Sequence, residues 1–291
     1  MESLAISNEI SPLETPAAEL RGRIEYHEQG DGPALVLVPG SFSTAAAWRS
    51  VVQAFRRPWR VVTTSLLGYG ETDERRDARA PHMDDEIEAL EEVIWRAGRG
   101  GPVHLVGHSF GAQVALATAV RGCAPLASLS LIEPPCPTAL LRADDKAHFT
   151  AFRAMTDRYT AAWRGGERRA ARRVIDFYGG IGTFDGFPAR VREFVMDTTA
   201  TNILDWVLAY DADTSAQALA AVAAPTLVLR GALGHPAVRR SNARIVRRLP
   251  NATLVDVADA GHFMIATHAA EVAALVEGHA AMIDACKFMP M

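Results

Sequence analysis

The chain has 291 residues, of which 49% are hydrophobic and 22% charged, and it carries a formal net charge of −4 at pH 7. This length is enough to bury a hydrophobic core as one large α/β domain, or as a core with an inserted lid, without disulfide cross-links. The weakly acidic balance excludes nucleic acid and anionic membrane surfaces as partners, because both select for clustered basic residues.

Cysteine usage and the N-terminal segment indicate the compartment. The three cysteines, Cys123, Cys136 and Cys286, are odd in number and have the spacing of neither a disulfide framework nor a zinc site. Met1 to Leu20 lacks the basic start and apolar centre of a signal peptide, and no run of about 18 apolar residues could span a bilayer. We therefore expect a soluble, cytoplasmic protein.

Predicted strands and helices alternate along most of the chain. Apolar or β-branched runs bounded by turn residues predict strands, in chain order, at Arg23–Glu28, Ala34–Val38, Arg60–Thr64, the run that begins at Val103, Leu126–Ile132, Thr226–Arg230 and Thr253–Val257. Apolar residues at helical spacing predict helices at Thr44–Phe55, Met83–Ala97, Ala112–Arg121, Ala237–Leu249 and Ala269–Ile283. This alternation predicts an α/β fold with a mostly parallel, doubly wound sheet.

Residues 136–223 interrupt the alternation. The segment is helix-rich, carries most of the phenylalanines and tyrosines, and lies between two predicted sheet strands. We therefore expect a core formed by residues 1–135 and 224–291, and a helical cap formed by residues 136–223. Such an insertion would cover the carboxyl ends of the strands, where the active sites of open α/β sheets lie.

The most informative stretch runs from Val103 to Ala112 and reads VHLVGHSFGA. It predicts a buried strand, a G-x-S-x-G turn and the start of a helix, which is the context in which this pattern carries a mechanism. Gly107 and Gly111 leave no Cβ where strand and helix crowd together, so Ser109 can occupy a strained bend with its hydroxyl exposed. The alternative is a glycine-rich turn with an ordinary serine.

A hydroxyl becomes a good nucleophile only when a base takes its proton, so the motif requires a histidine elsewhere. His262 follows the last predicted strand, which brings its imidazole to the same edge of the sheet as Ser109. We expect two backbone N–H groups to form an oxyanion hole, one from Phe110 at the start of the helix and one from Ser41 in the turn after Ala34–Val38. The alternative for the histidine is an ordinary place in a surface loop.

With these motifs the chain resembles the α/β-hydrolase superfamily, in its form with an inserted helical cap, from about Arg23 to Ala281. The resemblance rests on VPGSF at 38–42, LGYGET at 67–72, VGHSFG at 106–111, LIEPP at 131–135, PTLVLRG at 225–231 and AGHF at 260–263. It implies Ser109 as nucleophile, His262 as base and an ester-like or other carbonyl substrate. It is specific to the superfamily and selects no single enzyme.

Two departures from the superfamily pattern affect the expected site. Pro39-Gly40 replaces a common H-G pair and keeps the backbone donors. The usual acid is an aspartate shortly after the strand at 226–230, where this chain has Gly234. We expect Glu133, at a position where some members carry their acid, to hold the histidine tautomer, unless it only holds the hinge of the cap. Asp256 and Asp259 compete with Glu133 for this role, and a site without any acid is left open.

Two further features are expected to be mainly structural. His108, between a glycine and the serine of the turn, is interpreted as a packing residue. The aromatic residues of the insertion are expected to form its core, with a few lining an apolar pocket, and they include Phe149, Phe152, Tyr159, Trp163, Trp206 and Tyr210.

These features together predict a serine hydrolase, with no metal or organic cofactor, that acts on a small, largely apolar ester or a carbonyl compound cleaved at a C–O or C–C bond. A C–C bond hydrolase or lyase, or a cofactor-free perhydrolase, would use the same site. A non-catalytic ligand receptor is the alternative of a different class, and the glycine at position 234 favours it. The expected partner is a small-molecule substrate, and a homodimer is left open.

Overall fold

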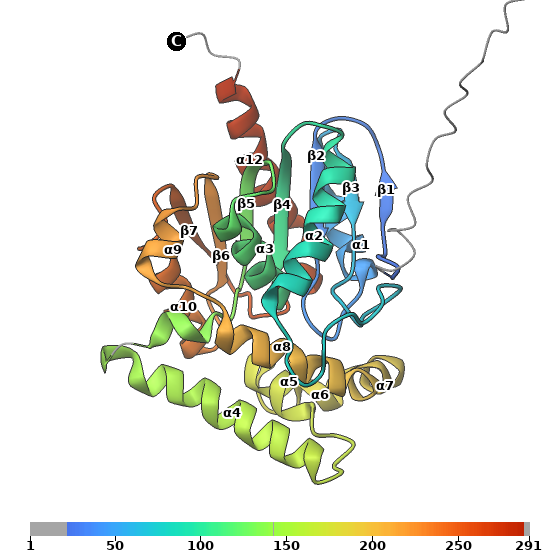
Figure 1. The fold of residues 1–291 in the computed structure, drawn as a ribbon, viewed down its shortest axis with the longest axis vertical. Helices are drawn as coiled ribbons and strands as arrows, with labels where there is room; N and C mark the ends of the chain where they lie inside the picture. Colours follow the sequence, from blue (N-terminus) through green and yellow to red (C-terminus); the bar gives the residue numbers. More distant parts are fainter. Residues whose placement is uncertain (1–21, 142, 288–291) are drawn as a thin grey trace, which may run out of the picture.

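The computed structural model describes residues 22–141 and 143–287, so the segment from Met1 to Leu20 lies outside the described residues. Its strands form one seven-stranded sheet in the order β1-β3-β2-β4-β5-β6-β7 (Figure 1). β1 pairs antiparallel with β3, and the other pairs are parallel. The strands are β1 (His27–Gln29), β2 (Ala34–Val38), β3 (Arg60–Thr63), β4 (Val103–His108), β5 (Leu126–Ile132), β6 (Thr226–Gly231) and β7 (Ala252–Val257). The fold is the predicted α/β-hydrolase architecture.

Helices cover both faces of the sheet, which is why its inner strands are buried on both sides and mostly apolar. In β2, Leu35 and Leu37 pack with the layer of α1 and α12, whereas Val36 and Val38 pack with the layer of α2 and α3. The helices of the core are α1 (Arg49–Ala54), α2 (Met83–Gly98), α3 (Phe110–Arg121), α10 (Pro236–Val246), α11 (Met264–Thr267) and α12 (Ala269–Lys287). In the described part of the chain, no helix combines the length and apolar character that a membrane span requires.

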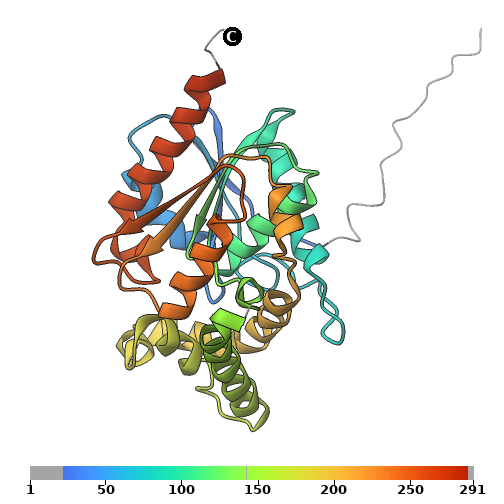
Figure 2. The same cartoon turned by 90° about the vertical axis from the view of Figure 1, so that its left-hand side faces the viewer.

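The chain between β5 and β6 forms a group of helices at one end of the sheet. In both views α4 to α8 lie together beyond that end, opposite the C-terminus (Figures 1 and 2). The helices of this connection are α4 (Lys146–Arg164), α5 (Arg172–Gly179), α6 (Thr183–Gly186), α7 (Ala189–Asp197), α8 (Thr199–Asp211) and α9 (Ala216–Ala220). The helices α4–α8 cover the end of the sheet where β4 and β5 finish, and we refer to them as the cap; α9 lies beside the sheet near β6 (Figure 1).

Three elements differ from the sequence-based expectation. The strand expected at Arg23–Glu28 pairs with β3 only over His27–Gln29, because residues 23–25 instead bond the loop at 71–73, with Asp73 N donating to the Arg23 carbonyl. The helix expected at Thr44–Phe55 is divided into a 3₁₀ turn, η2 (Ala45–Trp48), and α1. The short helix α11 follows His262 directly and was not predicted.

Register places the ends of neighbouring strands side by side. His108, the last residue of β4, pairs with Ile132, the last residue of β5. Residues 109 and 133 therefore leave the sheet next to each other. Ile132 pairs in turn with Leu229 of β6, so the segments that follow β5 and β6 also meet at this edge.

Two glycines allow the backbone to close around the turn after β4. A Cβ at Gly107 would lie 2.5 Å from the Ala112 Cα, and a Cβ at Gly111 would lie 2.1 Å from the Pro39 carbonyl oxygen. Both distances are far shorter than a real carbon contact. Only glycine therefore fits at either position with this backbone.

The Gly111→Ala substitution should lower the free energy of unfolding by about 3 kcal/mol or more, because a backbone carbonyl cannot move away as a flexible side chain could. The matched control is Gly278→Ala in α12, where an added Cβ meets nothing within 4 Å. It should leave stability unchanged or raise it by up to about 1 kcal/mol. Urea unfolding measures both variants, and equal stability of the two would contradict the packing described.

Candidate active site

Ser109 occupies a sharp bend between β4 and α3. Its backbone has φ 53° and ψ −126°, a conformation that L-residues rarely adopt. The bend is held by its own amide, which donates to the Ile132 carbonyl at 2.8 Å. As a result the side chain leaves the sheet at the N-terminus of α3 and lines a cavity beneath the cap.

His262 lies in the loop after β7 and reaches across to this bend. Its Nε2 is 2.9 Å from the Ser109 Oγ, and its Nδ1 is 3.1 Å from the Glu133 Oε2. The Tyr178 ring, supplied by α5 of the cap, stacks on the imidazole with centroids 3.9 Å apart and planes 22° from parallel. The imidazole is thus fixed by a hydrogen-bond partner at each nitrogen and by an aromatic ring on one face.

Glu133 is fully buried directly after β5, with φ 52°. Its Oε1 accepts a hydrogen bond from the Gly231 amide at 2.8 Å, which leaves Oε2 for His262. An ionised carboxylate only accepts, so it requires a proton on the histidine Nδ1 and leaves Nε2 as the acceptor that faces the Ser109 hydroxyl. This arrangement gives the histidine the tautomer that a general base needs.

Gly234, where the resemblance leads to an expected aspartate, lies against the same carboxylate. A Cβ built at Gly234 would be 3.1 Å from the Glu133 Oε1. The space near the imidazole that an aspartate after β6 would enter is therefore filled from β5. The lack of an acid at position 234 coincides with the presence of one at 133.

The two competing acids have other positions. Asp256 pairs with Arg230 at 2.7 Å and with Arg239 at 3.3 Å, and its side chain is half-exposed. Asp259 is an exposed residue of the turn after β7, with φ 55°. Of the acidic side chains in the described ranges, only Glu133 hydrogen-bonds the His262 imidazole.

The two residues expected to form an oxyanion hole both border the cavity. Ser41 follows β2, and Phe110 is the first residue of α3, where a backbone N–H has no acceptor within its helix. The Ser41 hydroxyl donates to the Asp205 carboxylate of α8 at 2.5 Å, and this bond anchors the turn that carries its amide. Both amides belong to segments that adjoin Ser109.

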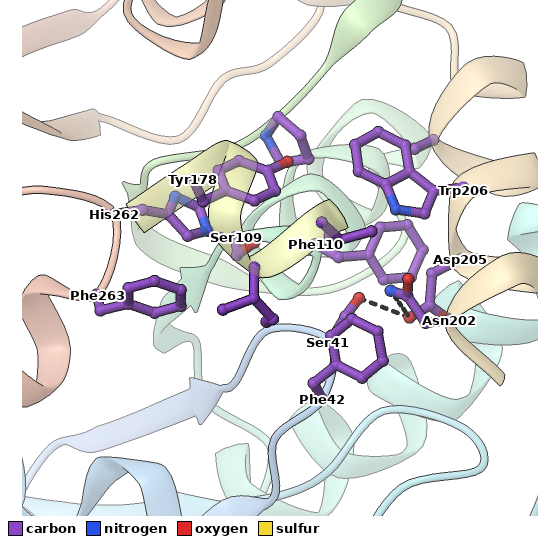
Figure 3. A pocket seen from close by; sticks show the side chains of 14 residues that line it. Ser41, Phe42, Ser109, Phe110, Tyr178, Asn202, Asp205, Trp206, His262 and Phe263 are labelled. Atoms are coloured by element: carbon purple, nitrogen blue, oxygen red, sulfur yellow. Dashed lines mark hydrogen bonds between the residues drawn. The ribbon is translucent and has the colours of Figure 1, made fainter. Parts of the chain in front are cut away.

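The cavity is mainly apolar and small, with a volume of about 40 Å³. Phe42, Phe110, Trp206 and Phe263 contribute aromatic surface, and Ser109 lies between the His262 end and the Asn202 end (Figure 3). This volume is well below the roughly 300–1,000 Å³ typical of ligand sites. An arrangement of this size suits a compact, largely apolar reactant.

Sequence patterns identified the cap aromatics only in part. Trp206 lines the cavity as expected of a few of these residues, whereas Phe152 and Tyr159 are buried and Trp163 is partly exposed. The direct stacking partner of His262, Tyr178, was not predicted. No periodic pattern in the sequence sets Tyr178 apart from the other aromatic residues of the insertion.

A buried ionic network behind the cavity was not predicted from the sequence either. The Asp205 carboxylate of α8 accepts from Arg76 Nη1 at 2.6 Å and from the Tyr69 hydroxyl at 2.7 Å. Arg76 also pairs with Glu86 at 3.2 Å, and burial raises the pKa of Glu86 to about 8 despite that cation. The network joins the cap to the 66–80 loop. The available signal was an aspartate inside the apolar stretch NILDWVLAY.

A second serine–histidine–carboxylate set occurs away from the cavity. His104 Nδ1 lies 2.8 Å from the Ser128 Oγ, and its Nε2 lies 3.1 Å from Asp284. These side chains are packed between the sheet and α12, and Ser128 in mid-strand is 1% exposed. Hydrogen-bond geometry alone therefore does not define a reactive serine, because a substrate must also reach it.

His108 supports the site from behind. Its Nε2–H donates to the His262 carbonyl at 2.9 Å, which fixes the loop that carries the imidazole. Burial, with a further contribution from His262, lowers the pKa of His108 to about 3. His108 is therefore neutral at physiological pH and acts as a structural donor, in agreement with its interpretation as a packing residue.

Among residues 22–141 and 143–287, no cluster of three or more His, Cys, Asp or Glu could hold a metal ion.

The low pKa of His108 should make stability depend on pH. Between about pH 6.5 and 3 the unfolded chain binds a proton that the folded chain does not, so the free energy of unfolding falls as pH falls, by up to about 1.4 kcal/mol per pH unit from this group. The His108→Gln variant keeps an N–H donor without titrating. Urea unfolding from pH 7.5 to 4.5 should show a shallower pH dependence for the variant, and parallel curves would contradict this assignment.

Comparison with known proteins agrees with this fold. The chain is 27% identical over 275 residues to the polyketide synthase ThaQ of Burkholderia thailandensis, and the match spans 88% of this chain but only 12% of that protein. A thermophilic esterase from Thermogutta terrifontis has the same fold, with a TM-score of 0.71, 21% identity, and coverage of 89% of this chain and 93% of the esterase. A meta-cleavage product hydrolase from Pseudomonas fluorescens gives a TM-score of 0.66 at 22% identity over 88% and 93% of the two chains.

A family model also matches most of the chain. The model described as the alpha/beta hydrolase family aligns with residues 35–275, which run from within β2 into the first part of α12 and include every residue of the candidate site. The chain therefore belongs to the alpha/beta hydrolase family.

Proposed function

We propose that this protein is a serine hydrolase that cleaves a small, largely apolar ester or related carbonyl compound. The observation that carries the proposal is the hydrogen-bonded series from Ser109 through His262 to Glu133, with the serine opening onto an apolar cavity. A nucleophile, a base with a fixed tautomer and a nearby pair of backbone donors are the components that acyl transfer requires.

The proposed reaction has two stages. Ser109 Oγ attacks the carbonyl carbon while its proton passes to His262 Nε2, and the Ser41 and Phe110 amides hold the negative oxygen. The tetrahedral adduct then breaks its bond to the leaving group, which takes the proton from His262. A water molecule, deprotonated by the same nitrogen, attacks the acyl-enzyme and releases the acid and the free serine.

Glu133 acts through His262 in this scheme. It keeps the proton on Nδ1 and stabilises the imidazolium that forms when the serine proton arrives. A non-catalytic receptor was favoured by the glycine at position 234. That argument loses its basis here, because a carboxylate from β5 bonds the imidazole instead.

Replacing the proposed nucleophile tests the mechanism directly. The Ser109→Ala variant should lower kcat/KM for p-nitrophenyl butyrate by more than about 10³-fold. The control is Ser128→Ala, which removes the serine of the inaccessible second set and should retain wild-type activity. Release of p-nitrophenol is followed at 405 nm, and retained hydrolysis by Ser109→Ala would rule the mechanism out.

The identity of the acid can be tested by moving it. Glu133→Gln should lower kcat by about 10³–10⁴-fold, because an amide can hold the wrong histidine tautomer. The double variant Glu133→Ala/Gly234→Asp should be at least about tenfold more active than Glu133→Ala alone, since the new carboxylate would enter the vacated space. Gly234→Asp alone, which places two carboxylates together, serves as the control. Glu133→Gln activity within tenfold of wild type would exclude Glu133 as the acid.

A further inference from the structure

The end of the cavity opposite His262 is polar and buried. Asn202 and Asp205 of α8 lie there beside Ser41, with Ser109 and Phe110 between them and the histidine (Figure 3). We call Ser41, Asn202 and Asp205 the polar corner. Asn202 is 2% exposed and Asp205 is 1% exposed, so bulk water satisfies neither side chain.

Within the polar corner, Asp205 is fully engaged by protein groups. Its Oδ1 accepts from Arg76, and its Oδ2 accepts from Tyr69 and Ser41. The guanidinium of Arg76 also balances its charge. Asp205 therefore has little capacity left for a ligand, and its role is to orient its neighbours.

Asn202 is oriented by the same carboxylate. Its Nδ2 points to the Asp205 Oδ2 at 3.4 Å, and its Oδ1 is buried with no hydrogen-bond partner among the residues that the structure describes. The opposite amide orientation would place two acceptors, the amide oxygen and the carboxylate, against each other. The carboxylate thus leaves the amide oxygen as the free group of a residue that lines the cavity.

A buried acceptor without a donor is costly, and such groups in native proteins call for a specific explanation. We propose that Asn202 Oδ1 accepts a hydrogen bond from a hydroxyl group carried by the substrate. The inference rests on the proposed function and narrows its substrate class to esters of small hydroxy acids. A carboxylate or ether at the same position would bring a further acceptor toward Oδ1 and is disfavoured.

The polar corner also indicates where on the substrate this hydroxyl lies. Asn202 and Ser41 both bond the same oxygen of Asp205, and the Ser41 amide is one of the two proposed oxyanion donors. A substrate whose carbonyl oxygen sits at that amide therefore has its nearest carbons beside Asn202. We place the hydroxyl on the second or third carbon of the acyl chain.

The test compares matched esters within each enzyme variant. The probes are the p-nitrophenyl esters of 2-hydroxybutyrate and 3-hydroxybutyrate, each as separate enantiomers, with the corresponding methoxy esters and the plain butyrate. For at least one hydroxy ester, wild-type kcat/KM should exceed that of its methoxy counterpart by about tenfold or more. A methoxy group keeps the acceptor oxygen and lacks the donor. This ratio therefore measures the loss of the donated hydrogen bond together with the effect of the added methyl group, at an ether oxygen of similar polarity.

Asn202→Leu, of similar size, should bring the hydroxy-to-butyrate ratio of kcat/KM down by about tenfold. Because both esters are measured on one preparation, partial loss of folded enzyme cancels. Asn202→Ala provides a second variant should the leucine misfold. Val207→Ala, on an exposed position of α8, is the control and should keep the wild-type ratio.

The outcomes separate this inference from the proposed function. Wild-type hydrolysis of the butyrate ester without preference for any hydroxy ester, or a preference that survives Asn202→Leu, overturns the inference alone. Failure to hydrolyse every ester, together with no Ser109-dependent labelling by a fluorophosphonate, overturns the proposed function and this inference with it.

Discussion

The hydrogen-bonded series from Ser109 through His262 to Glu133 depends on one constraint, which is that the neighbouring strands β4 and β5 end at the same level of the sheet. His108 and Ile132 end their strands as paired residues, so the serine and the glutamate emerge together. The loop after β7 then needs only to bring one imidazole between them. The His108 Nε2–H holds this loop in place by donating to the His262 carbonyl. Glycines at 107 and 111 are required because this geometry leaves no space for a Cβ.

The cap completes the site with both a wall and an electrostatic anchor. Tyr178 covers the imidazole, and Asp205 joins α8 to the turn after β2 and to the loop that contains Arg76. A buried ion pair is weak as a source of stability but strict in its geometry, because a lost partner leaves an uncompensated charge. Asp205 and Arg76 therefore fix the position of the cap helix relative to the oxyanion turn more than they strengthen the fold.

The strands, the mostly parallel sheet and the serine–histidine pair were accessible from sequence because they rest on local patterns. Wholly apolar runs such as Ala34–Val38 predict strands buried on both faces, and the motif around Ser109 is contiguous. Glu133 was predicted from its place after a strand and from the resemblance, because some members of the superfamily carry their acid at that position. The polar corner was not predicted, because Ser41 and Asp205 are 164 residues apart and no periodicity links them. The stacking of Tyr178 on His262 was not predicted for the same reason, because the packing of the cap depends on contacts between residues that are far apart in the sequence.

In the proposed mechanism Ser109, His262 and Glu133 work as one unit at a carbonyl held by two backbone amides. A crystal structure of the protein after reaction with a small alkyl fluorophosphonate, whose phosphorus mimics the tetrahedral carbon, tests this arrangement. We expect phosphorus bonded to the Ser109 Oγ, a phosphonyl oxygen between the amides of Ser41 and Phe110, and His262 still bonded to Glu133. Phosphorus on another side chain, or an imidazole turned away from Glu133, would contradict it.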